Sequence, residues 1–199
     1  MLLPATNKAK ERGRAIECVN KLHQMGLAAV MYAHDYDDFL PRLSQGTIQQ
    51  GDVVLWTDLL TPYLSGLSAE ELWLCPSGNR FPDPNGCGKP MVLHYGMNNY
   101  DYDGAGTEYL PGLGGRPPCP GGVQLHIVAE PDTLIYLADS DPESSPEDIG
   151  GQQSGTTDWP LTSLAENRHT HGYNALFLGG SVQWRPNAPN HREWAVRKK

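Results

Sequence analysis

The chain has 199 residues, of which 39% are hydrophobic and 19% are charged, a composition that suits one domain with a modest core. Its 22 glycines and 17 prolines indicate many loops. The net charge of −8 at pH 7 excludes a general nucleic-acid binder, because such a protein needs a basic contact face. No apolar stretch approaches the roughly 20 residues that span a bilayer.

Residues 5–36 carry a strong helix signal. Apolar residues recur there at steps of three and four, which predicts one buried stripe. The stripe comprises Ala15, Ile16, Val19, Leu22, Gly26, Ala29, Val30 and Ala33. The turns before it carry a basic run and are expected to project from the domain; the run is Lys8, Lys10, Arg12 and Arg14. Pro4 suits the first turn of a helix, but it would kink a helix that continues upstream.

The rest of the chain predicts short elements separated by polar loops. A short helix is expected at 56–64. Strands are expected at 53–55, 91–95 and 133–137, and the last of these is the most convincing buried strand. Residues 173–178 and 181–184 flank Gly179-Gly180, which predicts a β-hairpin with a type I′ turn, because that turn needs positive φ at both central residues.

These elements predict an α+β fold in which a small antiparallel sheet with long loops packs on the apolar half of the helix. We expect one domain over residues 1–199. Residues 1–36 form its N-terminal helix, and residues 37–199 form a globular, loop-rich β region.

The four cysteines, Cys18, Cys75, Cys87 and Cys119, form no Cys-x-x-Cys pair, so neither a zinc ribbon nor a thioredoxin-type site is supported. An even number of scattered cysteines is typical of two disulfides in an exported protein. Four buried free thiols are the alternative, because free cysteine is among the most buried residue types.

Short motifs are spread along the whole chain. They are Met1-Leu2-Leu3-Pro4-Ala5, Lys8-Ala9-Lys10, residues 18–22, Gly26-Leu27-Ala28, residues 32–36, Cys75-Pro76-Ser77, residues 95–98 and 137–140, and Arg168-His169 with Phe177 and Gly180. Together these motifs resemble those of type IV pilin-like proteins, close to the pseudopilin-like proteins of type II secretion systems. The group that the chain resembles ends in an H-x9-D-G signature. Here His169 is the motif histidine, and Gly179 stands where that group usually has aspartate, so a role for that aspartate as ligand or turn cap is in doubt.

The resemblance implies a pilin-like fold and a structural subunit of a pseudopilus or pilus-like fibre rather than an enzyme. Its partners would be other pilin-like subunits, and the membrane through an N-terminal helix preceding Met1. The protein would be anchored in the inner membrane before assembly, with its body periplasmic or extracellular. The basic run would then lie just past the membrane exit and meet lipid headgroups or acidic neighbours; a solvated helix face is the alternative.

Three site hypotheses remain. We predict disulfides Cys18–Cys75, which would pin the packed half of the helix to the loop after Trp73, and Cys87–Cys119. A calcium loop is possible at Asp139, Asp141 and Glu143, with Glu147 and Asp148 nearby, because carboxylate oxygens suit Ca²⁺; a solvated acidic loop is the alternative, and no cofactor is certain. His169 and His171 lack the carboxylate pattern of a catalytic or metal triad, so we expect a loop-ordering role.

A fibre-displayed or secreted binding module that recognises a polysaccharide or a secreted substrate is the alternative function. The loops at 41–51, 78–90, 101–122 and 140–160 would carry its specificity. Trp56, Trp73, Trp159 and Trp184 would stack on sugars in that case, whereas core packing is the default for tryptophan. A secreted hydrolase is a third possibility, but the sequence holds no recognisable catalytic constellation.

Overall fold

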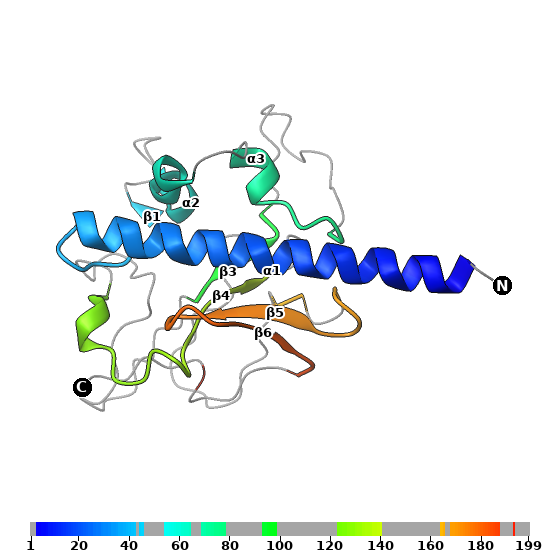
Figure 1. The fold of residues 1–199 in the computed structure, drawn as a ribbon. Helices are drawn as coiled ribbons and strands as arrows, with labels where there is room; N and C mark the ends of the chain where they lie inside the picture. The colour runs from blue at the N-terminus through cyan, green and yellow to red at the C-terminus, as the bar shows by residue number, and fades with distance from the viewer. Residues whose placement is uncertain are drawn as a thin grey trace, which may run out of the picture.

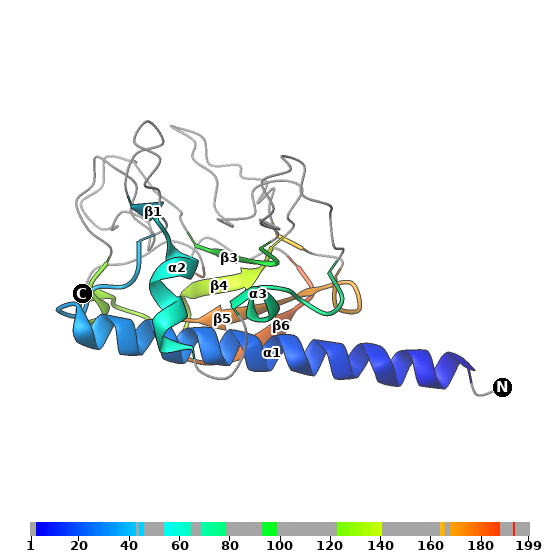
Figure 2. The same cartoon turned by 90° about the horizontal axis from the view of Figure 1, so that it is seen from above.

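The computed structural model describes residues 3–42, 44–45, 54–64, 69–78, 93–98, 123–140, 164–165, 168–187 and 193. Its dominant element is helix α1, which runs for 33 residues from Leu3 to Asp35 and confirms the predicted N-terminal helix. The N-terminal end of α1 extends beyond the rest of the molecule (Figures 1 and 2). Pro4 lies in the first described turn of α1, where its missing N–H costs little.

A four-stranded antiparallel sheet packs on one side of α1, in the order β3-β4-β5-β6 (Figure 1). The strands are β3 (Tyr95–Met97), β4 (Ile135–Asp139), β5 (Tyr173–Phe177) and β6 (Val182–Arg185). Every residue of β4 and β5 is buried, so both faces of the central strands are covered. The predicted strand at 133–137 is therefore confirmed in type, although it begins and ends two residues later.

The smaller elements lie on the other side of α1 (Figure 1). They are β1 (Ser44–Gln45), β2 (Val54–Leu55), α2 (Trp56–Leu60) with a 3₁₀ turn (Thr61–Tyr63), and α3 (Ala69–Leu72). Strands β1 and β2 form a separate antiparallel pair, and a second 3₁₀ turn spans Leu125–Ile127. The short helix predicted at 56–64 is thus observed as α2 and its 3₁₀ extension. Residues 91–92 of the strand predicted at 91–95 lie outside the described residues; Leu93 and His94 are not in a strand, and β3 begins at Tyr95.

The buried face of α1 matches the predicted stripe in part, because Leu22, Ala29 and Ala33 are buried as predicted. Cys18, Leu22, Met25 and Tyr32 are buried in the core, whereas Ile16 is 61% exposed and Val30 is 50% exposed. The helix packs closely on the sheet at Gly26, where an added Cβ would lie 2.9 Å from Leu176 Cδ2 on β5. Gly26 is therefore needed as a small residue at this contact.

The hairpin of β5 and β6 is confirmed, but its turn is not type I′. Only Gly180 has positive φ (93°), and Gly180 N donates to Phe177 O at 2.8 Å. This pattern fits a three-residue hairpin loop that ends in a glycine of positive φ. The arrangement as a whole is the expected pilin-like α+β fold, with one long helix lying on a small antiparallel sheet. Within the described residues, no helix has the length and apolar character needed to cross a membrane.

Candidate functional site

Four chemically reactive side chains meet inside the protein, although they come from distant parts of the chain. Cys18 lies on α1, Cys75 follows α3, Asp139 ends β4, and His169 precedes β5. Their side-chain ligand atoms all lie within 4.8 Å of one another, and each residue is at most 3% exposed. We call these four residues the Cys-His-Asp cluster.

The distances within the cluster place His169 between a sulfur and a carboxylate. Its Nε2 lies 3.3 Å from Cys75 Sγ and 3.6 Å from Asp139 Oδ2. The sulfurs of Cys18 and Cys75 lie 2.6 Å apart, and both thiols are free in this structure. A disulfide bond is about 2.03–2.05 Å long, so the predicted Cys18–Cys75 bond stays a prediction, while the two residues do lie side by side.

The turn that carries Cys75 is held by hydrogen bonds on both sides. Cys75 N donates to His94 Nδ1 at 2.9 Å, and Gly78 N donates to Cys75 O at 2.9 Å. A Cβ at Gly78 would lie 2.4 Å from the His94 ring, so only glycine fits without displacing that imidazole. These contacts fix the backbone of Cys75 and hence the direction of its thiol.

The turn that carries His169 is conformationally strained. Thr170 (φ 56°) and His171 (φ 64°) both have positive φ, which is uncommon for residues other than glycine and is a marked outlier for β-branched threonine. His169 N donates to Gly172 O at 3.0 Å, and Trp184 Nε1 donates to His169 O at 2.7 Å. Because strained backbone of this kind concentrates at functional sites, the turn supports a specific role for His169.

Asp139 is a fully buried carboxylate with little compensation. Asn174 N donates to its Oδ2 at 2.7 Å, whereas Oδ1 has no hydrogen-bond partner within the described part of the chain. Arg168 lies close by, but its guanidinium donates to His94 O at 2.8 Å and Ser140 O at 2.5 Å. A buried carboxylate with an unpartnered oxygen is costly, which makes Asp139 the residue of the cluster most in need of an explanation.

Glu11 extends the cluster to the projecting part of α1. Its Oε1 accepts a hydrogen bond from Ser77 Oγ at 2.6 Å and lies 3.6 Å from His169 Nδ1. Arg14 Nη1 lies 3.4 Å from the other carboxylate oxygen of Glu11. The helix therefore contacts the body from Glu11 onward, one turn earlier than the predicted boundary near Ala15.

The electrostatics couple the four groups. The hydrogen bond with the Cys18 thiol, together with the nearby His169, lowers the pKa of Cys75 to about 4, although burial acts to raise this pKa. The same hydrogen bond and burial raise the pKa of Cys18. Burial and the negative charge of Cys75 raise the pKa of Asp139 to about 6. Burial lowers the pKa of His169, but Cys75 and Asp139 outweigh it and raise that pKa overall.

The other predicted site residues are dispersed. His171 is exposed. Gly179 lies close to Asp132, which precedes β4. A Cβ at position 179 would lie 1.9 Å from Asp132 Oδ1. The carboxyl of Asp132 thus occupies the space that a side chain at position 179 would need, which accounts for glycine where the resembled group has aspartate.

Of the residues proposed for a calcium loop, only Asp139 lies within the described residues. Asp139 ends a buried strand rather than sitting in a solvated loop, while Asp141, Glu143, Glu147 and Asp148 lie outside the described residues. Cys87 and Cys119 also lie outside them, as do most of the loops expected to confer specificity.

Two further sets of predicted residues lie at the surface or in the core. Lys8, Lys10 and Arg12 are exposed, and Arg14 is half-buried beside Glu11. Trp56 and Trp73 are buried and meet edge to face with ring centroids 5.2 Å apart, so they do not present a face for sugar stacking. Trp184 is 47% exposed, and Trp159 lies outside the described residues.

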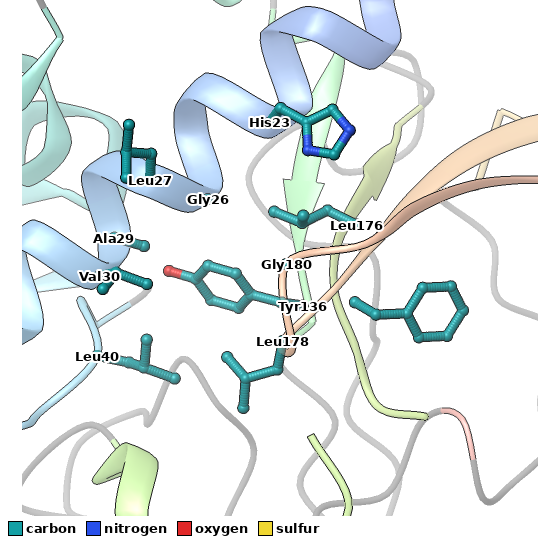
Figure 3. A pocket seen from close by; sticks show the side chains of 11 residues that line it. His23, Gly26, Leu27, Ala29, Val30, Leu40, Tyr136, Leu176, Leu178 and Gly180 are labelled. Carbon is teal, nitrogen blue, oxygen red and sulfur yellow. The ribbon is translucent and has the colours of Figure 1, made fainter. Parts of the chain in front are cut away.

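An open apolar groove of about 260 Å³ lies between α1 and the β5–β6 hairpin (Figure 3). Leu27 and Val30 line it from the helix, and Leu176 and Leu178 line it from the sheet side. Tyr136 forms its floor between them (Figure 3). The groove continues an exposed apolar face of α1 onto the sheet.

Sequence reasoning placed Cys18 beside Cys75 but did not connect them with Asp139 and His169. The signal for that connection was present in the pattern of the strands. Asp139 ends the apolar run 134–138 and His169 closely precedes β5, so antiparallel pairing of the two strands brings both residues to the same end of the sheet.

Comparison with known proteins gives one partial match. No curated protein and no solved structure matches the chain. Residues 7–73, about a third of the chain, are similar to the family SBP_bac_10, which is described as a protein of unknown function (DUF1559).

Proposed function

We propose that this chain is the body of a structural subunit of a pilus-like or pseudopilus fibre. The pilin-like fold and the motifs that resemble those of pseudopilins support the proposal. In this role the body is periplasmic or extracellular, the subunit is anchored in the inner membrane before assembly, and the chain performs no catalysis. The partners are further pilin-like subunits.

The observation that carries the proposal is a second apolar face on α1. Ile16, Leu27, Val30 and Met31 are 46–64% exposed, and they lie on the side opposite the buried Cys18, Leu22 and Met25. Leu27, Val30 and Met31 adjoin one another on this face. Ile16 lies on the same face about three turns earlier, with the exposed Asn20 and His23 between, and we call the four apolar residues the stripe. A helix that served only its own domain would carry polar residues there.

The exposed basic residues of the projecting turns fit the same role. Lys8, Lys10 and Arg12 are exposed, whereas the stripe begins only at Ile16. Cations at such a position suit contact with anionic lipid headgroups or with acidic side chains of a neighbouring subunit. The net charge of −8 supplies acidic partners on a neighbouring copy.

The test is filament formation by the full-length gene product in its own cells, detected by electron microscopy with antibodies against the body. Leu27→Glu adds one charge to the apolar stripe and should abolish labelled filaments. Gln24→Glu adds the same charge at an exposed polar position of α1 and serves as the matched control. Both variants should melt at the wild-type temperature, because both positions are exposed.

Absence of labelled filaments from the wild-type protein would refute the proposed function. Filaments that form equally well with Leu27→Glu and Gln24→Glu would show that the stripe is not the contact between subunits.

A further inference from the structure

The Cys-His-Asp cluster has the composition of a transition-metal site. Two thiols, one imidazole and one carboxylate supply four ligand atoms, all buried and all within 4.8 Å of one another. Thiolate and imidazole ligands select zinc and other soft or borderline metals, and calcium and magnesium prefer sites made of oxygen ligands alone. We propose that the reduced cluster binds one Zn²⁺ ion through Cys18, Cys75, Asp139 and His169.

The distances fit such a site at three of its four ligands. Tetrahedral zinc, with bonds of about 2.3 Å to sulfur and about 2.0–2.2 Å to nitrogen and oxygen, holds sulfur and nitrogen about 3.5 Å apart. The same geometry holds nitrogen and oxygen about 3.4 Å apart. The observed separations are 3.3 Å from Cys75 Sγ to His169 Nε2 and 3.6 Å from His169 Nε2 to Asp139 Oδ2.

The two sulfurs must move apart for zinc to bind. They lie 2.6 Å from each other, whereas two sulfurs on one tetrahedral zinc are about 3.8 Å apart. The separation of the two sulfurs must therefore grow by about 1.2 Å, through movement of the Cys18 or the Cys75 side chain. Zinc and a Cys18–Cys75 disulfide are therefore mutually exclusive states of the same two sulfurs.

A metal ion accounts for the polar groups that the fold otherwise leaves without compensation. Oδ1 of the fully buried Asp139 has no partner within the described residues, and a cation beside this carboxylate offsets the cost of burying it. Two thiolates, a carboxylate and Zn²⁺ sum to −1, and the guanidinium of Arg168 lies close enough to balance that charge.

The surroundings also resemble those of metal ligands. A ligating histidine usually presents its second ring nitrogen to a carboxylate or a carbonyl, and Glu11 Oε1 lies 3.6 Å from His169 Nδ1. The amide of Cys75 is fixed by His94 Nδ1 at 2.9 Å. His94 thus fixes the backbone of one ligand, whereas His169 Nδ1 has no hydrogen-bond partner within the described residues and Glu11 is the carboxylate near enough to become one.

The site would join four segments that are far apart in sequence: α1, the turn after α3, the end of β4 and the turn before β5. Because an unfolded chain does not preform the site, the binding free energy of zinc would add to the stability of the fold.

The experiment uses the whole chain with Cys87→Ser and Cys119→Ser, so that Cys18 and Cys75 are the only thiols. The protein is fully reduced, freed of metal and titrated with Zn²⁺ or with Co²⁺ as a spectroscopic probe. We expect one metal per chain, a rise in melting temperature with Zn²⁺, and the thiolate-to-metal charge-transfer band and visible bands of tetrahedral Co²⁺.

Matched variants assign the ligands. His169→Ala and Asp139→Asn should each weaken metal binding, and Cys75→Ser should remove the charge-transfer intensity of one thiolate. His171→Ala is the control, because that histidine is exposed and only two residues away. Glu11→Gln should lower the affinity about 10- to 100-fold while the Co²⁺ spectrum keeps its shape.

Two results would overturn the proposal. One is a reduced, folded chain that takes up no Zn²⁺ and gives Co²⁺ no thiolate band. The other is wild-type protein from its own cells that carries a Cys18–Cys75 disulfide in a non-reduced peptide map. The peptide map of wild-type protein does not depend on any variant folding, and no outcome here bears on whether filaments form.

Discussion

Lys21 offers the sharpest test of how α1 is joined to the body. This lysine is buried on α1 one turn after Cys18, and its Nζ donates to Glu71 O at 3.0 Å and Leu74 O at 2.8 Å. Leu74 directly precedes Cys75, so the ammonium group holds the segment that carries the cluster thiol. Replacement of Lys21 by Met keeps most of the aliphatic volume but removes both hydrogen bonds and the charge.

The expected loss is large for one side chain. A hydrogen bond to a charged group contributes about 1.5–3 kcal/mol, and the two bonds share one donor group, so Lys21→Met should lower the free energy of unfolding by about 2–4 kcal/mol. Urea unfolding followed by circular dichroism measures this as a fall in the midpoint with an unchanged slope.

The matched control separates the buried hydrogen bonds from the surface ion pair. Lys21 Nζ also lies 3.0 Å from Glu17 Oε1, but the Glu17 side chain is 54% exposed. Glu17→Gln should therefore cost about 0.5 kcal/mol or less. If Lys21→Met changes stability no more than Glu17→Gln does, the two carbonyl contacts do not hold the Cys75 segment and the reasoning is wrong.

Three further contacts are tested by substitution. Gly172→Ala should lower stability by about 1–3 kcal/mol in urea, because its Cβ would lie 2.4 Å from Arg185 O, whereas Gly13→Ala, with nothing within 4 Å, should raise helix content. Gly179→Asp should destabilise the wild type more than it destabilises Asp132→Ala, with a coupling energy of about 0.5–3 kcal/mol in a double-mutant cycle. His126→Ala should raise the pKa of Asp38 in an NMR titration. Burial acts to raise this pKa in the wild type, but hydrogen bonds from His126 outweigh burial and lower it. Because the folded-state pKa of Asp38 is depressed, its stabilising effect is present above about pH 4 and is lost as the pH falls; a flat titration difference would contradict this.

The fold was predictable where local pattern and tertiary packing agree. The long run of helix-forming residues in 5–36 and the two apolar segments around Gly179-Gly180 indicated α1 and the β5–β6 hairpin directly. The turn type was missed because Gly179 serves a close approach rather than a positive φ. Its Cβ would meet Asp132, a residue 47 positions earlier that no local pattern connects with it.

The orientation of α1 was missed for a related reason. Periodicity detects every apolar residue on a helix, but it cannot separate a face that packs inside the domain from a face that stays exposed. Ile16 and Val30 satisfied the predicted spacing but are exposed. Lys21 is buried because two backbone carbonyls accept hydrogen bonds from its ammonium group. A buried lysine paired with backbone carbonyls leaves no signature in the hydrophobic pattern.

The Cys-His-Asp cluster could be assembled from the sequence only in part. The even number of cysteines was typical of two disulfides, Cys18–Cys75 was predicted as one of them, and the pilin-like motifs singled out His169. Asp139 was assigned to an acidic loop because the residues after it are acidic and turn-rich. Its burial follows from strand pairing, since β4 lies between β3 and β5 and every residue of β4 is covered.

The position of the cluster gives it a mechanical meaning within the proposed fibre. Glu11, Cys18 and Lys21 lie within three turns of α1 near the point where the helix leaves the body, and their contacts reach Ser77, Cys75 and Leu74 of a single short segment. A pull on the projecting end of α1 would load these contacts before the apolar contacts of Met25 and Tyr32 deeper in the body. Zinc or a disulfide at Cys18 and Cys75 would strengthen this junction, whereas an apolar contact there would resist shear along the helix less. In the proposed fibre, the buried polar cluster would keep the helix attached to the body when neighbouring subunits hold its far end.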